Sequence, residues 1–205
     1  MSHLMSYTGK RIDIPDPKPE QIDIVDIATQ LSRMPRFVGA TSRFFSVAQH
    51  SIMVAYLSVA ITEHYSPPPH LDGFLRQQML KEGLLHDGHE SYMGDTPSPL
   101  KIMLGKQFHN VEKSIDRAIR QRFQLASTMP PNVKVADYMA LMIESTHLRG
   151  PDTLDLDRIP SEPKGLITLL QDNSWYKLAE RTVAQHWDHE TAKDKFLKEW
   201  YYIEG

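Results

Sequence analysis

The sequence predicts an all-α protein. Apolar residues recur at the helical spacing of three and four positions along most of the chain. Prolines and glycines divide these stretches into segments of ordinary helix length. No strong alternation of apolar and polar residues predicts a sheet. We therefore expect a helical bundle, and 205 residues are enough for one domain with a substantial core.

The N-terminal quarter contains an extended lead-in, a helix and a loop. Prolines at positions 15, 17 and 19 exclude a helix from residues 7–21. Apolar spacing and acidic residues in the first turn predict an amphipathic helix over 22–34 that ends near Pro35. The stretch RFVGATSR, residues 36–43, reads as a loop.

Two histidines lie on, or at the end of, predicted helices whose apolar faces form the core. The spacing of Val54, Leu57 and Ile61 predicts a helix over 44–64, and His50 lies on its buried stripe. The segment SPPPH, residues 66–70, breaks this helix. A second helix over 74–85 is expected to end at the sequence His86-Asp87-Gly88, because glycine is a usual helix stop.

The remainder is also predicted to be helical. DTPSPLK, residues 95–101, reads as a loop, and helices are expected over 108–124, 132–148, 164–171, 175–187 and 190–202. Residues 150–165 look like a connector. We therefore expect a core of residues 1–150 and a C-terminal helical extension, residues 151–205, that packs on the same domain.

Composition narrows the classes of function. The formal net charge of −3 argues against a general nucleic-acid binder. The absence of cysteine excludes thiolate ligands, so a bound metal would need imidazole and carboxylate. No apolar run approaches the roughly 18 residues of a membrane-spanning helix, and no signal peptide begins the sequence. We expect a cytoplasmic protein with no membrane or nucleic-acid partner.

Four side chains form a candidate metal site. His50, His86, Asp87 and Asp137 lie on or at the end of apolar faces of three predicted helices. An unpaired buried carboxylate costs several kcal/mol, so such groups are paired, neutralised or bound to metal. Any one of them alone is more typical of a satisfied core residue or a helix cap. The four together favour a divalent cation with open positions for water and substrate.

The order of these residues resembles a known family. The pattern H…HD…D, with acids three and eight positions and a lysine fourteen positions after Asp87, is similar to the nucleotidase branch of the HD superfamily of metal-dependent phosphohydrolases. YTGKRIDIPDP and IDIVDIATQLSRMPRFVGATSRFFSVAQHS resemble a subgroup of bacterial and phage hydrolases. That subgroup includes the phage dATP triphosphohydrolases that accompany 2-aminoadenine genomes. The resemblance covers residues 7–148.

The resemblance implies a role for each matched residue. It implies a helical HD-domain bundle in which a divalent metal (zinc, cobalt, manganese or magnesium) is ligated by His50, His86, Asp87 and Asp137. Glu90 would act on the attacking water or the leaving group, and Asp95 would orient that water. The alternative for Glu90 is an ordinary acid at a helix end. His89 either extends the metal site or is exposed, and exposure is the expectation.

The substrate site is expected to combine cations with apolar side chains. Arg36, Lys101 and Lys134 are candidates for phosphate binding, and Lys134 should point into the cavity because it lies one turn before Asp137. A solvated lysine is an equally good interpretation of Lys134. Candidates for packing on a base are Phe37, Val38 and Pro99, for which core packing is the stronger alternative.

The expected function is hydrolysis of a small-molecule deoxynucleotide, specifically of dATP to deoxyadenosine and triphosphate. Two alternatives stay open: a 5′-deoxyribonucleotidase that acts on monophosphates, and a metal-bound nucleotide sensor without turnover. The resemblance also implies a homo-oligomer, for which a hexamer is one arrangement, and the host cytoplasm as its location if a phage encodes it.

Overall fold

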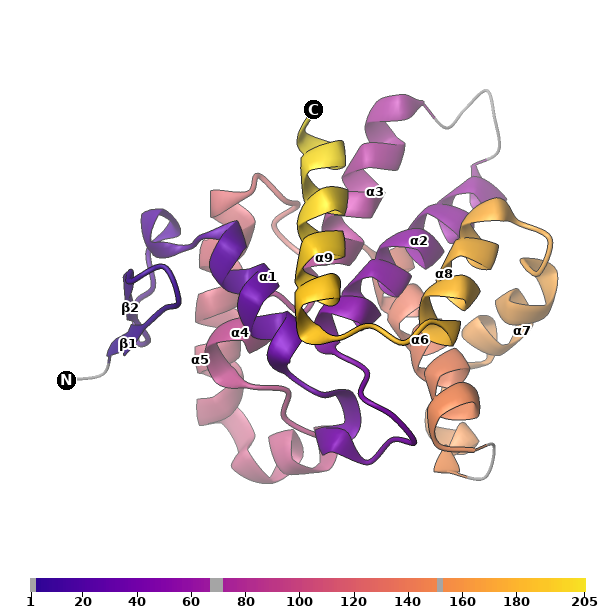
Figure 1. Cartoon of the computed structure of the whole chain (residues 1–205), viewed down its shortest axis with the longest axis horizontal. Helices are drawn as coiled ribbons and strands as arrows, with labels where there is room; N and C mark the ends of the chain where they lie inside the picture. The colour runs from indigo at the N-terminus through magenta and orange to yellow at the C-terminus, as the bar shows by residue number, and fades with distance from the viewer. Residues whose placement is uncertain (1–2, 67–71, 151–152) are drawn as a thin grey trace.

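The all-α prediction is confirmed by a computed structural model, which describes residues 3–66, 72–150 and 153–205 (Figure 1). The longer helices are α1 (Ile24–Arg33), α2 (Val47–Tyr65), α3 (Gly73–Leu85), α5 (Ser98–Arg122), α6 (Pro131–Leu148), α7 (Ser161–Leu169), α8 (Ser174–Ala184) and α9 (His189–Glu204). The predicted SPPPH break falls between α2 and α3, and most of it lies outside the described residues. None of the described helices is long and apolar enough to cross a membrane.

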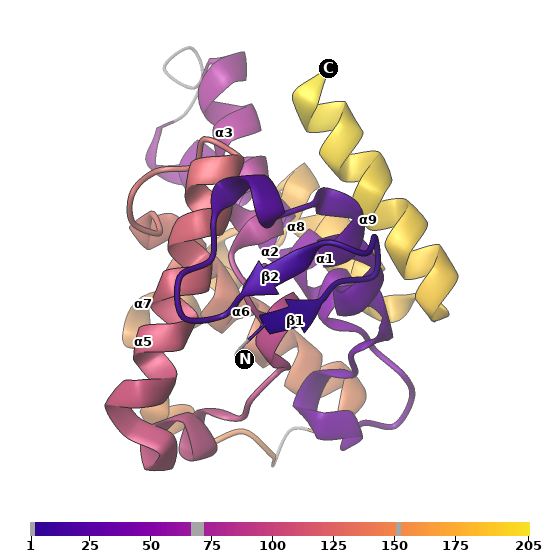
Figure 2. The ribbon, with the colours of Figure 1, turned by 90° about the vertical axis from the view of Figure 1, so that its left-hand side faces the viewer.

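A small hairpin joins the first residues of the chain to the lead-in of residues 7–21 (Figure 2). Strands β1 (His3–Met5) and β2 (Arg11–Asp13) pair antiparallel, and a 3-10 turn, η1 (Pro19–Gln21), follows them. Each strand has three residues, which is too short for an alternating pattern to stand out in the sequence. The lead-in is therefore more structured than expected, although the fold class is unchanged.

Capping side chains fix where the first helices begin. Asp23 accepts a hydrogen bond from the backbone N–H of Val25 at the start of α1. Ser46 accepts one from Gln49 at the start of α2, three residues later than the apolar spacing indicated. Such caps satisfy N–H groups that have no partner within the helix, so they determine boundaries that periodicity leaves loose.

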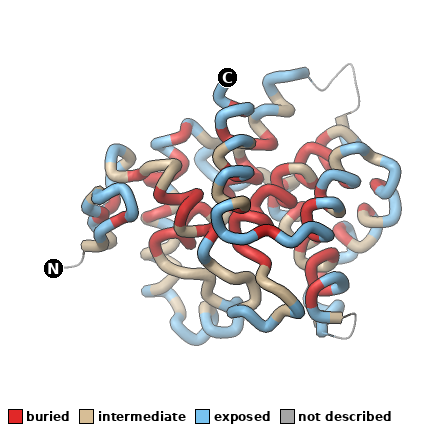
Figure 3. Tube along the Cα trace, viewed as in Figure 1, coloured by how far each residue is buried: buried red, intermediate tan, exposed pale blue. Residues whose placement is uncertain are grey.

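Helix α2 is the central element of the bundle. It packs against α3, α6 and α8, and most of its residues are buried (Figure 3). The C-terminal helices complete the core: Phe196 of α9 is fully buried in one apolar cluster, and Ala179 of α8 in the other. Helix α9 packs along α1. Helix α2 is thus covered on several sides by helices from both ends of the chain.

Close packing of α3 on α2 brings the two predicted metal-binding histidines together. A Cβ on Gly83 would lie 2.6 Å from the Cα of Ala55 and 2.8 Å from its backbone nitrogen. Only glycine permits so close a contact without displacing α2 or α3. The contact lies one helical turn before His86, so it sets how near that residue comes to α2.

Helix α5 begins earlier than predicted. Residues 98–101 of the expected DTPSPLK loop form its first turn, with proline at the first positions, where a missing N–H costs nothing. The helix is then broken at Gly105, whose φ of 68° and ψ of −151° are open to glycine. Lys101 therefore stands on a short helical segment before the break and not on a loop.

Candidate metal centre

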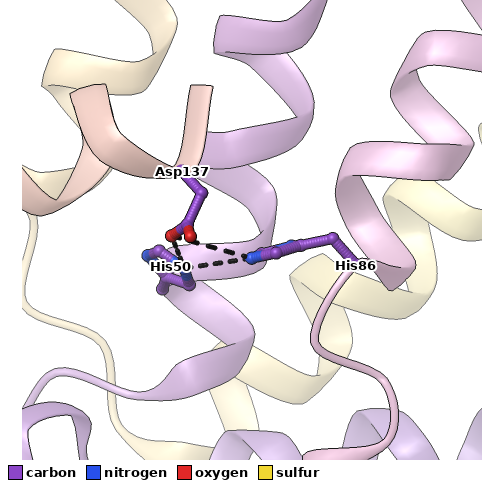
Figure 4. Close-up of side chains that lie close together, drawn as sticks. All are labelled: His50, His86 and Asp137. Carbon is purple, nitrogen blue, oxygen red and sulfur yellow. Dashed lines mark hydrogen bonds and ion pairs between the residues drawn. The ribbon is translucent and has the colours of Figure 1, made fainter. Parts of the chain in front are cut away.

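The structure brings the four predicted ligands together. His50 comes from α2, His86 caps the C-terminus of α3, Asp87 follows it in the turn, and Asp137 comes from the second turn of α6. Figure 4 shows the two imidazole rings and the Asp137 carboxylate converging from three helices. Both histidines are buried. Three helices that meet at the core thus supply one cluster of nitrogen and oxygen atoms.

The distances within this cluster fit a small cation. The Nε2 atoms of His50 and His86 are 3.3 Å apart. His50 Nε2 lies 3.5 Å from an Asp87 oxygen and 3.3 Å from an Asp137 oxygen, and His86 Nε2 lies 3.1 Å and 3.9 Å from the same atoms. Four ligands about 2.0–2.2 Å from a tetrahedral metal would lie about 3.3–3.6 Å from one another. His50, His86 and Asp137 therefore form a donor set for one divalent ion, with an Asp87 oxygen beside both histidines.

The outer nitrogens of both rings are already engaged. His86 Nδ1 lies 2.8 Å from the carbonyl oxygen of Gly83, which can only accept, so Nδ1 carries the hydrogen. His50 Nδ1 lies 2.6 Å from the fully buried carboxylate of Glu144. In neutral imidazoles this leaves both Nε2 lone pairs facing Asp87 and Asp137. Such a cluster of acceptors attracts positive charge, either a proton on an imidazole or a metal ion, and such carboxylate–histidine pairs are typical of metal sites.

The electrostatics of the cluster reflect this excess of acceptors. Burial lowers the pKa of His50, and so does the nearby Arg36, but three carboxylates outweigh them and raise the pKa well above its usual value. Burial raises the pKa of Asp87 and of Asp137, but the two histidines lower each below the usual value. The carboxylates therefore stay ionised, as metal ligands must be.

Arg36 lies beside the ligands and links two further acids. Its guanidinium is 3.2 Å from Glu144 and 4.0 Å from Asp95. Burial lowers the pKa of Arg36, but the surrounding carboxylates raise it above its usual value, so the side chain stays charged. Burial also raises the pKa of Asp95 despite Arg36. Glu144 thus pairs with both His50 and Arg36.

Glu90 begins the short helix α4 (Glu90–Met93) and is buried close to Asp87. Burial raises the pKa of Glu90, and the carboxylates of Asp87 and Asp95 raise it further, to well above its usual value. Its Oε1 lies 3.4 Å from the ammonium of Lys101, and its Oε2 is buried with no hydrogen-bond partner among the described residues. The free oxygen is suited to contact a bound substrate or water.

His89 is buried and not exposed, so that expectation is wrong. Its Nε2 lies 3.2 Å from Glu112 of α5, which reaches back over the turn that carries Asp87. Glu112 also lies 3.0 Å from Lys101 and 3.2 Å from Nδ1 of His109. These three partners lower the pKa of Glu112 well below its usual value, against the effect of burial. Glu112 thereby ties together the segments on either side of the Gly105 break.

A cavity of about 440 Å³ opens beside the ligands. It is lined by Arg36, Phe37, Val38, Asp87, Glu90, Asp95, Thr96, Pro97, Ser98, Pro99, Lys101, Asp137, Leu141, Arg149, Thr153, Leu154 and Arg158. The predicted acids and substrate-binding residues are therefore grouped around one space, with one exception. Lys134 is exposed and does not line the cavity, because the first turn of α6 points its side chain to solvent. The prediction that Lys134 points into the cavity is wrong, and its alternative, a solvated lysine, fits the structure.

The loop after α1 lines the cavity in a strained conformation. Phe37 and Val38, within η2 (Arg36–Gly39), have φ angles of 54° and 55°. This left-handed region costs about 1–3 kcal/mol for such residues and persists only where surrounding contacts impose it. The same loop is joined to the end of α6 by the hydrogen bond from the backbone N–H of Ser42 to the carbonyl oxygen of Leu148.

Comparison with known proteins identifies the family. A family model described as HD domain matches residues 28–144, more than half of the chain. The chain belongs to the HD-domain family. It is also 33% identical over 148 residues to the uncharacterized protein YfdR of Escherichia coli, covering 72% of this chain and 73% of that protein. A second relative is an uncharacterized protein of Rhodobacter capsulatus, 29% identical over 162 residues, which cover 76% of this chain and 78% of that protein.

The protein is therefore an HD domain. The general chemistry of this family is hydrolysis of phosphate esters with the aid of a divalent metal ion. The matched region spans His50, the His86-Asp87 pair and Asp137, so the converging cluster lies wholly within it. Arg158 lies beyond the match yet lines the same cavity.

Four charged residues at the metal-binding cluster or around the cavity were not predicted as site residues: Glu112, Glu144, Arg149 and Arg158. The sequence carries a signal for Glu144 alone, since it lies seven positions after Asp137 on the same helical face, among apolar residues. The other three stand in polar stretches of the sequence where charged side chains are ordinary, so no pattern distinguishes them.

Proposed function

We propose that this HD domain hydrolyses deoxynucleotides with the aid of a divalent metal, and that its preferred reaction converts dATP to deoxyadenosine and triphosphate. The observation that carries the proposal is one cavity with a metal-binding cluster at its inner end, two acids beside that cluster, and cations and apolar side chains around them. The base and the length of the phosphate chain rest on the sequence resemblance.

The residues around the cavity are suited to phosphate-ester hydrolysis. A divalent ion held by His50, His86, Asp87 and Asp137 would supply an activated water and polarise a phosphoryl oxygen. Attack on the α-phosphorus breaks its bond to the 5′ oxygen, and the leaving oxygen takes a proton. Glu90 has the raised pKa that a proton donor needs at neutral pH. We assign Asp95, which lines the same cavity, to orienting the attacking water.

A second candidate function is 5′-deoxyribonucleotidase activity on monophosphates. It is favoured by the charges nearest the metal cluster. Arg36 is paired with Glu144 and lies near Asp95, while Lys101 is paired with Glu90 and Glu112. Two cations that already have acidic partners suit one phosphate better than three.

The test is a substrate panel. The purified protein is incubated with each common deoxynucleoside triphosphate and monophosphate in manganese, cobalt, zinc or magnesium, and products are resolved as nucleoside, phosphate, pyrophosphate or triphosphate. Deoxyadenosine and triphosphate from dATP would support the preferred reaction, and nucleoside from monophosphates alone would support the second candidate. Metal-loaded protein that binds nucleotides but releases no product would overturn both and indicate a sensor.

We also propose that the protein self-associates. The first segment of α5 exposes four large apolar side chains beside the cavity: Leu100, Ile102, Met103 and Leu104. Exposed apolar clusters are typical of contact surfaces. Light scattering should give a mass above 23.6 kDa for the native chain and a smaller oligomer for the double variant Ile102→Ser, Met103→Ser. A native monomer would refute the proposal.

A further inference from the structure

We propose that Arg149 and Arg158 form a binding site for the distal phosphates of a nucleoside triphosphate at the mouth of the cavity. The inference rests on the proposed function and names the feature that would select a triphosphate over a monophosphate. Both residues line the cavity, and both lie beyond residues 28–144, the part of the chain that the family model matches.

The carboxylates around the cavity mean that a bound triphosphate needs further cations such as Arg149 and Arg158. Four carboxylates line it, and four cations face them: Arg36, Lys101, Arg149 and Arg158. The first two cations are each held between two acids, with Glu144 and Glu112 adding negative charge behind the wall. A bound divalent ion offsets only two charges. A triphosphate brings about four negative charges, against about two for a monophosphate, so its outer phosphates need further cations.

Arg149 is positioned to bind these outer phosphates. It caps the C-terminus of α6, and its guanidinium carbon lies 4.8 Å from the centroid of the Phe37 ring. Arg36 lies on the same ring at 5.2 Å. A guanidinium that rests its face on an aromatic ring keeps its N–H donors free in the plane of the group. The strained backbone at Phe37 thus holds an outer and an inner cation around one ring.

Arg158 supplies the second cation from within the connector, residues 150–165. It ends the 3-10 turn η4 (Leu156–Arg158), and its exposed side chain lies 2.9 Å from the exposed Asp155. An exposed ion pair of this kind is weak, so a phosphate group can replace Asp155 as the partner of Arg158. Arginine is suited to this exchange because its planar fork binds phosphate through two N–H donors.

Inorganic tripolyphosphate tests the site without reference to base or turnover. Its affinity and that of orthophosphate are measured by calorimetry on metal-loaded protein, with magnesium in excess over either anion. Arg149→Ala and Arg158→Ala should each weaken tripolyphosphate binding about tenfold, the loss of one charged hydrogen-bonding partner. Orthophosphate affinity should change much less. Arg117→Ala removes an exposed arginine that is also ion-paired but lies outside the cavity, and should change neither.

A second variant sharpens the assignment. Asp155 accepts the N–H of Asp157 at the start of η4, so Asp155→Asn keeps an acceptor for this cap while releasing Arg158. Tripolyphosphate affinity should rise. Equal losses of affinity for both anions in the Arg149 and Arg158 variants would overturn the inference, because they would place these cations on the reacting phosphate. Unchanged affinities would overturn it as well.

Kinetics separate this inference from the proposed function. In the arginine variants the ratio of kcat/KM for dATP to kcat/KM for dAMP should fall about tenfold, while Arg117→Ala keeps the native ratio. If the native protein hydrolyses neither nucleotide, the proposed function fails, yet the tripolyphosphate measurements still decide on the phosphate site. If both are hydrolysed and the ratio is unaltered by the variants, the inference fails alone.

Discussion

The inner end and the mouth of the cavity are built in different ways. The metal-binding cluster is carried mainly by α2, α3 and α6, with buried histidines whose outer nitrogens are fixed by Glu144 and Gly83. The mouth is carried by η2, the first segment of α5 and the connector that contains η4, and its side chains are largely exposed. Long packed helices hold metal ligands with the precision that metal chemistry needs. Short connecting segments can change which substrate is bound without disturbing those ligands.

The largest effect should follow from removing a ligand of the inner cluster. His86→Ala or Asp87→Ala should abolish tight metal binding and all hydrolysis, because three ligands remain in a largely buried site. Metal content after dialysis, measured by elemental analysis, checks the ligand assignment. His189→Ala removes a half-exposed histidine at the start of α9 and should keep the native metal content. Native metal content in both ligand variants would show that the ion binds elsewhere.

The contrast between the two regions also explains what the sequence predicts. His50, Asp137 and Glu144 interrupt apolar helical faces, and a polar residue on such a face is conspicuous because its burial needs a partner. Arg149 and Arg158 stand in polar connecting segments, where nothing distinguishes a substrate contact from an ordinary surface charge. Spacing therefore indicates the chemistry of the site more readily than its selectivity.

The prediction is wrong at Lys134 and at the start of α5. Lys134 was placed by helical spacing alone, but in the first turn of α6 it is Val133 that is buried, and the side chain of Lys134 is exposed. The early start of α5 depends on prolines that break a helix in its interior and favour its first turn. The division at residue 150 stays a proposal, and the packing of α8 and α9 on α2 and α1 supports treating both parts as one domain.

The second largest effect is expected at Glu90. Glu90→Gln keeps the shape of the side chain but cannot donate or accept the proton, so kcat should fall about 10²- to 10⁴-fold while metal content and nucleotide affinity stay near native. Single-turnover rates and metal analysis measure the two parts separately. Glu190→Gln, on the exposed face of α9, serves as the matched control. A kcat near the native value would place Glu90 outside the reaction.

A smaller effect should follow from loosening a ligand without removing it. Glu144→Ala should lower metal affinity about 10- to 100-fold, as loss of a carboxylate behind a ligating histidine usually does, and Glu144→Gln should recover part of it by keeping an acceptor for His50. Competition with a chelator measures the affinity. Glu82→Ala is the control, since Glu82 is equally buried and paired with Arg120 but does not contact the cluster. It should lower the melting temperature and leave metal affinity unchanged, whereas an equal loss of affinity in Glu82→Ala would reduce Glu144 to a general structural residue.

The smallest effect is expected at the apolar side chains of the mouth, and it concerns the base. Val38 and Pro99 line the cavity from two separate segments, η2 and the start of α5. We predict that an apolar slot between them accepts the C2 edge of adenine, which bears only hydrogen. Guanine and 2-aminoadenine carry an amino group there, whose donors would lose their water without gaining a partner.

The native protein should therefore prefer dATP to dGTP and to 2-amino-dATP, and Val38→Ala or Pro99→Ala should reduce that preference by less than about tenfold. The effect is small because Val38 is 68% exposed, so the slot excludes water only in part. The ratio of kcat/KM among the three nucleotides measures it, and Leu169→Ala, which removes an exposed apolar side chain from α7, should leave the ratio unaltered. Equal hydrolysis of all three nucleotides by the native protein would eliminate the slot. The phosphate chain, gripped by Arg149 and Arg158, would then be the main feature by which the mouth selects a substrate.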